Sequence, residues 1–324
     1  MRALTLASVC VAAFVLSTAA RAGDLGAVNL TVEHAWSGVA PCLSKTAYTD
    51  DSIARRLLQL SRGAQIADAR VIGIDFVAQP APLIAAFRQI TRLAPRSGAG
   101  VGDRVPVGCH DVLCASRAIF GNEAGPRLLL IAAAYHFNAS SLGETSSESW
   151  SAEDLDRLIA AFDDMPRGFF PLAGGEYRAL VHRADETWWS PAPTLAFEVV
   201  ARAGNGQPGI MIEDGWARAG DDERRVVLIH EVAHEFTRVQ GRGWQTAWRQ
   251  AAEADAEDAT GTSKPAVASA YAERNLDEDF AESVAAYRYI APLLKRRAPH
   301  RYALLKDWVF KGAEYGSARA CAGR

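Results

Sequence analysis

The sequence lacks the features that mark several large classes of protein. Its 35 Lys and Arg residues are outnumbered by 38 Asp and Glu residues, and the net charge of -3 gives no basic surplus of the kind that nucleic-acid-binding proteins carry. Internal repeats and low-complexity segments are absent. The hydrophobic fraction of 49% and the charged fraction of 23% are ordinary for a globular protein. These absences exclude fibrous and intrinsically disordered proteins and give no reason to expect DNA as a partner.

Long apolar runs are also missing, except at the N-terminus. Arg2 is followed by an uncharged stretch over residues 3–20, and residues 20–22 have the A-x-A pattern of a signal-peptidase cleavage site. We therefore predict a signal peptide over residues 1–22 and a mature protein that is secreted or periplasmic. The alternative is an uncleaved membrane anchor, because the run is nearly long enough to span a bilayer.

Cysteine is scarce, and one of the five cysteines lies within the predicted signal peptide. The other four, Cys42, Cys109, Cys114 and Cys321, are an even number in a compartment where disulfides form. Two disulfides are therefore expected, in one of three connectivities that the sequence leaves open. The local option pairs Cys109 with Cys114 and leaves Cys42 for Cys321. The competing interpretation is a second metal site at residues 109–111, although no second close pair of ligands accompanies it.

The patterns along the chain divide it into two regions after the signal peptide. Residues 23–145 contain two helix-compatible stretches, at residues 53–67 and 82–93, and a buried apolar run at residues 128–137. We expect this first region to be mostly helical and assign it no function. Residues 146–324 form the second region.

The second region has clearer signals. Ser151 precedes two acidic residues and an amphipathic pattern, which predicts the start of a helix. Helices are then expected from Asp221 almost to Lys311. Between them, three short stretches bounded by Gly and Pro are predicted strands: residues 178–183, 194–201 and 209–213. The expected fold is α+β, in which a small mixed sheet packs on the helix that follows it and a helical C-terminal subdomain comes last.

One short motif in the helix after the strands carries the chemistry. His230 and His234 are four residues apart, so on a helix both imidazoles project from one face within reach of one ion. Glu231 can reach a water bound to that ion, and zinc lowers the pKa of such a water toward neutrality. The motif predicts hydrolysis with Glu231 as general base and then general acid. The alternative is two exposed histidines on a surface helix, and Glu235 stands where such helices usually have an apolar residue.

A catalytic zinc site needs a third protein ligand. A third histidine at metzincin spacing is absent after His234, so the candidates are downstream carboxylates. The near acidic cluster (residues 253–258) is interleaved with alanine and is expected to be a solvated helix face. In the far cluster (residues 277–282), apolar residues at helical spacing can bury one side and hold a carboxylate rigidly. There we favour Glu278, whose alternative role is to cap its helix with Asn275.

These residues together resemble the lethal-factor-like zinc peptidases, which include the catalytic domain of anthrax lethal factor and the secreted Pro-Pro endopeptidases. The similarity rests on the HExxH motif, Tyr271 and the E-D-F-A-E segment at residues 278–282, within residues 150–310. By this resemblance the fold is zincin-like and Glu278 is the third zinc ligand. The resemblance also implies that Glu282 lies close behind the metal and that Tyr271 assists the oxyanion. It implies no substrate preference.

The sequence therefore predicts a secreted zinc endopeptidase with one Zn²⁺ per chain, bound by His230, His234 and Glu278. The expected substrate is a peptide or protein in extended conformation that adds as a strand beside residues 210–212, taken as an edge strand. Neither a nucleic acid nor stable membrane insertion is expected. Two other functions stay open: a secreted binding or toxin-like module on a zincin scaffold, with zinc structural or absent, and a hydrolase of cell-wall peptides.

Overall fold

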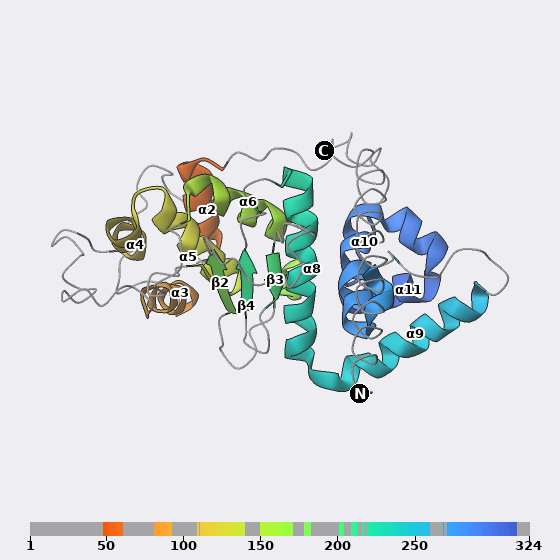
Figure 1. Cartoon of the computed structure of the whole chain (residues 1–324). Helices are drawn as coiled ribbons and strands as arrows, with labels where there is room; N and C mark the ends of the chain where they lie inside the picture. The colour runs from red at the N-terminus through yellow and green to blue at the C-terminus, as the bar shows by residue number, and fades with distance from the viewer. Residues whose placement is uncertain are drawn as a thin grey trace, which may run out of the picture. The chain divides into compact units, whose positions relative to one another are not determined.

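The computed structural model in Figure 1 describes most of the predicted elements but not the ends of the chain. The signal peptide, Cys42 and Cys321 lie outside the described residues. The residues that the structure does describe form mainly helices, with a few short strands. The described residues are 48–60, 81–92, 109, 111–139, 150–170, 178–182, 201–203, 209–212, 216, 219–259, 268 and 271–315.

The chain divides into two compact units. One, here called the sheet unit, contains the described residues from 48 to 182 and from 201 to 242. The other, here called the helical unit, contains those from 243 to 315. The boundary predicted after residue 145 thus falls inside the sheet unit. Each unit is described by itself below.

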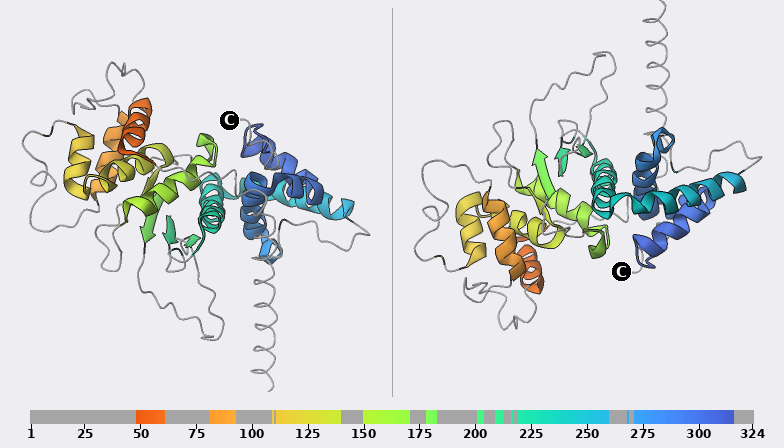
Figure 2. Two further views of the ribbon diagram at one scale, coloured as in Figure 1. Left: turned by 90° about the horizontal axis from the view of Figure 1, so that it is seen from above. Right: turned by 90° about the horizontal axis from the view of Figure 1, so that it is seen from below.

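The first part of the sheet unit is helical, as expected for the N-terminal region. Its helices are α2 (Asp50–Leu60), α3 (Ala81–Arg92), α4 (Val112–Phe120) and α5 (Ala124–Tyr135). Figure 2 shows α2, α3 and α4, coloured red to yellow, grouped together, and α5 contacts all three. Because α5 is apolar along nearly its whole length, it is buried among them. The prediction that residues 128–137 form a buried core segment is confirmed.

The N-terminal helices share a core with the elements that follow. The next helix is α6 (Ala152–Asp163), where Ser151 Oγ accepts the N–H of Asp154 at 3.1 Å, as the sequence predicted for a helix start. Phe162 of α6 packs against Tyr135 and Phe137, with ring centroids 5.0 and 5.2 Å apart. This shared aromatic core explains why the region before residue 145 does not form a separate unit.

Four short strands form one mixed sheet in the order β1-β2-β4-β3. The pairs β1–β2 and β2–β4 are parallel, and β3–β4 is antiparallel. Two of the predicted strands are confirmed, and the third is seen only from Ala201 onward. The strands are β1 (Phe137–Asn138), β2 (Arg178–His182), β3 (Ala201–Ala203) and β4 (Gly209–Ile212).

The prediction that residues 210–212 are an edge strand is wrong. Within β4, Ile210 is paired with Leu180 of β2 on one side and with Ala203 of β3 on the other. Among the described strands, β3 and β1 end the sheet. Edge position depends on pairing between distant segments, which the local pattern of β4 does not encode.

Helix α8 (Asp221–Gln240) packs on the sheet, running beside β3 and contacting β3, β4 and α6 (Figure 1). Its buried apolar residues recur every three or four positions, which gives the helix one face for the core. These residues are Leu228, Ile229, Val232, Ala233 and Phe236. The ring of Phe236 stacks on that of Phe169 in the 3₁₀ turn η3 (Arg167–Phe169), with centroids 5.1 Å apart. Gly241, which follows α8, has a φ of 67° that glycine adopts easily.

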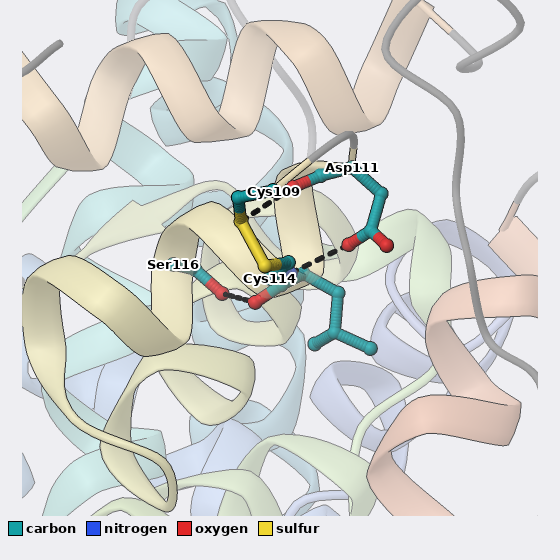
Figure 3. The surroundings of a disulfide bond; sticks show 5 residues. Cys109, Asp111, Cys114 and Ser116 are labelled. Carbon is teal, nitrogen blue, oxygen red and sulfur yellow. Dashed lines mark hydrogen bonds between the residues drawn. A yellow bond between two sulfur atoms is a disulfide. The ribbon is translucent and has the colours of Figure 1, made fainter. Parts of the chain in front are cut away.

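A disulfide joins Cys109 to Cys114 at the start of α4 (Figure 3). The carboxylate of Asp111 caps this helix by accepting the N–H of Cys114. Of the connectivities that the sequence left open, the structure contains the local pairing. A second metal site at residues 109–111 is disfavoured, since Cys109 is bonded to sulfur and Asp111 is a helix cap.

Helices α4 and α5 approach each other closely at Gly125. A Cβ atom on Gly125 would lie 2.3 Å from the backbone oxygen of Ser116. Gly125→Ala should therefore lower the free energy of unfolding by about 1–3 kcal/mol, because the backbones must separate. Denaturant unfolding measures this loss, and Gly168→Ala is the control because nothing lies within 4 Å of its added Cβ. Equal stability of the two variants would contradict the close approach.

Among its described residues, the helical unit has three helices and one 3₁₀ turn. Helix α10 contacts η5, α9 and α11, and its residues Phe280, Val284 and Tyr287 are buried as predicted. Its backbone departs from helical geometry at Ile290, two residues before Pro292, since proline cannot continue the hydrogen-bond ladder. The elements are α9 (Trp244–Asp258), η5 (Tyr271–Arg274), α10 (Leu276–Arg297) and α11 (Pro299–Trp308). The 3₁₀ turn η4 (Gly241–Gly243) precedes them in the chain and spans the boundary between the units.

Tryptophans surround Phe280 in the core of the helical unit. Its ring centroid lies 5.0 Å from that of Trp244, 5.0 Å from that of Trp248 and 5.6 Å from that of Trp308. This aromatic cluster holds α9, α10 and the end of α11 together. Among the helices that the structure describes, in either unit, none has the length and hydropathy to cross a membrane.

Candidate metal centre

Helix α8 brings His230 and His234 together, as the spacing predicted. Their Nε2 atoms are 3.1 Å apart, and their rings stand nearly perpendicular at 81° with centroids 4.8 Å apart. His230 is buried and His234 is half-buried. The alternative of two exposed histidines on a surface helix is therefore wrong. The buried face of α8 against the sheet fixes the backbone from which both rings project.

The histidine pair fits a tetrahedral metal ion. Two nitrogen ligands, each about 2.0–2.1 Å from a tetrahedral zinc, lie roughly 3.3 Å from each other. The observed separation of 3.1 Å between the Nε2 atoms is close to that value. Both nitrogens thus converge on one point, and imidazole suits zinc, copper, iron and nickel. The pair alone does not select zinc from these metals.

Two carboxylates belong to the same part of α8. Glu231 follows His230 and is 8% exposed, so its side chain is largely removed from bulk water. Glu235, which the sequence marked as unusual for such a helix, is only 2% exposed. Its Oε2 atom accepts a hydrogen bond from Nε of Arg238 at 2.9 Å. The charge of Glu235 is therefore partnered by the guanidinium one turn later, which explains how the helix tolerates this residue.

The helical unit brings Tyr271 and Glu278 together. The Tyr271 hydroxyl lies 3.4 Å from Oε1 of Glu278, and both side chains are half-buried. The guanidinium carbon of Arg274 lies 4.7 Å from the centroid of the Tyr271 ring, within cation–π range. Tyr271 opens η5 and Glu278 lies in the first turn of α10, so a short stretch of chain sets their separation.

Asn275 caps α10 beside Glu278. The Oδ1 atom of Asn275 accepts the N–H groups of Asp277 and Glu278 at 3.0 and 2.9 Å. The cap predicted from the sequence is thus present, and the Glu278 group that it binds is the backbone amide. Glu282 follows Glu278 by four residues, so the two carboxylates lie on one face of α10.

The prediction for the near acidic cluster is wrong at one residue. Glu253, Glu257 and Asp258 are exposed, as expected for a solvated helix face. Asp255, however, is only 1% exposed. Its Oδ2 atom accepts a hydrogen bond from Nε of Arg301 at 2.9 Å, and Arg301 is 2% exposed. Asp255 therefore belongs to the core of the helical unit.

A second buried carboxylate shares Arg301 with Asp255. Asp279 accepts from Nη1 of Arg301 and, at 2.8 Å, from Nε1 of Trp248. Burial raises the pKa of Asp279, while Arg301 and Trp248 act in the opposite direction. We name Asp255, Asp279, Arg301 and Trp248 the charge network; its role was not predicted from the sequence.

Two further histidines lie on other elements. His300 is exposed in α11, with Nε2 3.0 Å from Oδ2 of Asp258. His136 ends α5 in a left-handed conformation with φ 62°.

Comparison with protein-family models, with curated proteins and with solved structures finds no match to this chain. The assignment of a function therefore depends on the chemistry of the residues above.

Proposed function

We propose that this protein is a secreted zinc endopeptidase in which His230, His234 and Glu278 bind one Zn²⁺ and Glu231 is the general base. The observation that carries this proposal is the 3.1 Å separation of the two Nε2 atoms on a buried helix with Glu231 beside them. Two nitrogens and one carboxylate oxygen form a common ligand set for a catalytic zinc, which keeps its fourth position open.

Each proposed residue has one role in the reaction. A bound Zn²⁺ supplies a Lewis acid and lowers the pKa of water. Glu231 accepts the proton of the attacking water and returns it to the leaving amine. The Tyr271 hydroxyl donates a hydrogen bond to the oxyanion that develops on the scissile carbonyl. Glu282, one turn after Glu278 on the same face of α10, lies behind the metal and is not itself a ligand in this proposal.

The sheet supports a binding mode for an extended peptide. Strand β3 ends the sheet among the described strands and contacts α8, the helix that carries the histidines. We propose that substrate adds as a strand beside β3, with main-chain hydrogen bonds providing affinity for many sequences. The proposed partner of the substrate is thus β3 and not residues 210–212, which lie inside the sheet. The mixed sheet packed on α8 and the helices after it are compatible with a zincin-like fold.

Zinc content is the first test of the proposal. Purified protein should contain close to one zinc per chain by mass spectrometry. Glu278→Gln should lower the zinc affinity, measured by competition with a chelator, because one anionic ligand is lost. Glu273→Gln is the matched control, since Glu273 is exposed in η5 only five residues away. A parent protein that binds no zinc, or equal affinity in both variants, would contradict the ligand set.

A peptide-library digest then separates the open functions. Cleavage by the parent and not by a Glu231→Gln variant supports an endopeptidase. Stoichiometric zinc without cleavage of any library member favours the binding or toxin-like module. Cleavage confined to cell-wall peptides assigns the third function, with the same residues in the same roles.

A further inference from the structure

We propose that the charge network positions Glu278 for metal binding, with Asp279 and Arg301 as positioning residues. This inference rests on the proposed function, since it takes Glu278 as the third zinc ligand. All the contacts that support it lie within the helical unit. They join α9 and α11 to the first turn of α10, where Glu278 lies next to Asp279.

The network is built from side chains that have almost no access to water. Asp255 of α9, Asp279 of α10 and Arg301 of α11 are 1%, 5% and 2% exposed. Nε of Arg301 donates to Asp255 and Nη1 donates to Asp279, so a single guanidinium bridges two helices. Such a planar fork can hold two carboxylates in fixed directions.

Each carboxylate has further donors that fix its position. Asp255 accepts the backbone N–H of His300 at 2.7 Å and that of Arg301 at 3.2 Å, so a side chain of α9 caps the start of α11. Asp279 accepts from the indole of Trp248 at 2.8 Å. Asp255, Asp279 and Arg301 are thus each held by at least two partners, and the network can resist rotation of α10.

Residues before and after Glu278 in the sequence fix the position of its backbone. Before it, Asn275 binds its amide through Oδ1 and accepts the N–H of Asp279 through its backbone oxygen at 3.0 Å. Directly after Glu278, the side chain of Asp279 accepts hydrogen bonds from Arg301 and Trp248. The direction of the Glu278 side chain from the backbone is therefore determined by its neighbours. A ligand must be fixed to within about 0.5 Å to support a catalytic metal.

Stability alone is a weaker explanation of this network. Replacing a buried ion pair with apolar residues is often neutral or stabilising, so a fold does not need one for stability. Partners of metal ligands, in contrast, commonly change metal affinity or activity by about 10–100-fold when they are altered. The two explanations differ in what they predict for zinc affinity in a variant that stays folded.

The decisive variant is Asp279→Asn, which keeps the size and the indole acceptor but removes the charge. Asp277→Asn is the matched control, because it removes the same charge from an exposed position in the same turn. We expect zinc affinity, by chelator competition, to fall by about 10–100-fold in Asp279→Asn and to stay within about threefold in Asp277→Asn. The visible spectrum of the Co²⁺-substituted protein should change only in the first variant, as ligand geometry changes.

A metal-free measurement completes the test. Amides of residues 277–282 should exchange hydrogen faster in apo Asp279→Asn than in the apo parent. If that variant does not fold, Arg301→Lys, which keeps the charge but not the fork, is measured in its place with the same expectation. Unchanged zinc affinity, cobalt spectrum and exchange would overturn the positioning role while zinc binding by the parent stands. A parent without zinc would overturn the proposed function, and the ligand role of Glu278 with it.

Discussion

Replacing Glu231 by glutamine should reduce kcat/KM for peptide hydrolysis by roughly 10²–10⁴-fold while leaving zinc bound. Glutamine has nearly the same shape but cannot accept the proton of the attacking water at neutral pH. Because His230, His234 and Glu278 are unchanged, metal content and affinity should remain those of the parent. The measurement is a fluorogenic peptide assay on protein of known zinc content.

A matched control variant tests whether loss of any negative charge from α8 lowers activity. Glu223→Gln removes one charge from an exposed position near the start of the same helix and should keep nearly full activity. If Glu231→Gln hydrolyses peptide as fast as the parent, the general-base role is wrong. Loss of zinc from this variant would instead mean that Glu231 helps to hold the metal.

Arg301→Met should lower the free energy of unfolding of the helical unit by about 3–5 kcal/mol. The variant leaves Asp255 and Asp279 buried without their guanidinium, and uncompensated buried charges are costly. Denaturant unfolding can be followed by tryptophan fluorescence, since Trp244, Trp248 and Trp308 surround Phe280 in this unit.

The loss in Arg301→Met should depend on pH. Burial already raises the pKa of Asp279 in the parent, and removal of Arg301 raises it further. For an acid whose pKa is higher in the folded than in the unfolded protein, folding is favoured at low pH. Parent and variant share the same unfolded pKa, so the deficit should grow as pH rises above the raised pKa of Asp279 in the parent and shrink on acidification. A deficit that is the same at pH 3.5 and pH 7 would contradict this origin.

A triple variant is the control for the loss of the arginine itself. In Asp255→Asn/Asp279→Asn/Arg301→Met, the buried charges are removed together, so most of the lost stability should return. If the triple variant is as unstable as Arg301→Met alone, the cost arises from packing of the Arg301 side chain and not from unpaired charge.

The residues on α8 could be predicted from the sequence because their relation is local. An i, i+4 spacing fixes two side chains on one face of any helix, so the meeting of His230 and His234 needed no knowledge of the fold. The same holds for the caps at Ser151 and Asn275, which act on amides two or three residues away. Local chemistry predicted these features well.

The charge network could not be predicted because its partners are distant in the chain. Arg301 is 46 residues from Asp255 and 22 from Asp279. One local signal was present: Asp255 follows Trp248 by seven residues, so it lies on the buried stripe of α9 and not on its solvated face. Strand order and the shared core of Tyr135 and Phe162 likewise depend on long-range packing, which explains the wrong edge strand and the displaced boundary.

The disulfide between Cys109 and Cys114 bears on how a zinc count is interpreted. In a reducing cytosol, or with a dithiol in the buffer, this bond opens and two soft thiolate ligands are released five residues apart. They could take up zinc far from α8 in the sequence and raise the measured stoichiometry without adding activity. Preparations made through an oxidising compartment and kept free of thiols would tie the metal content to the histidine pair.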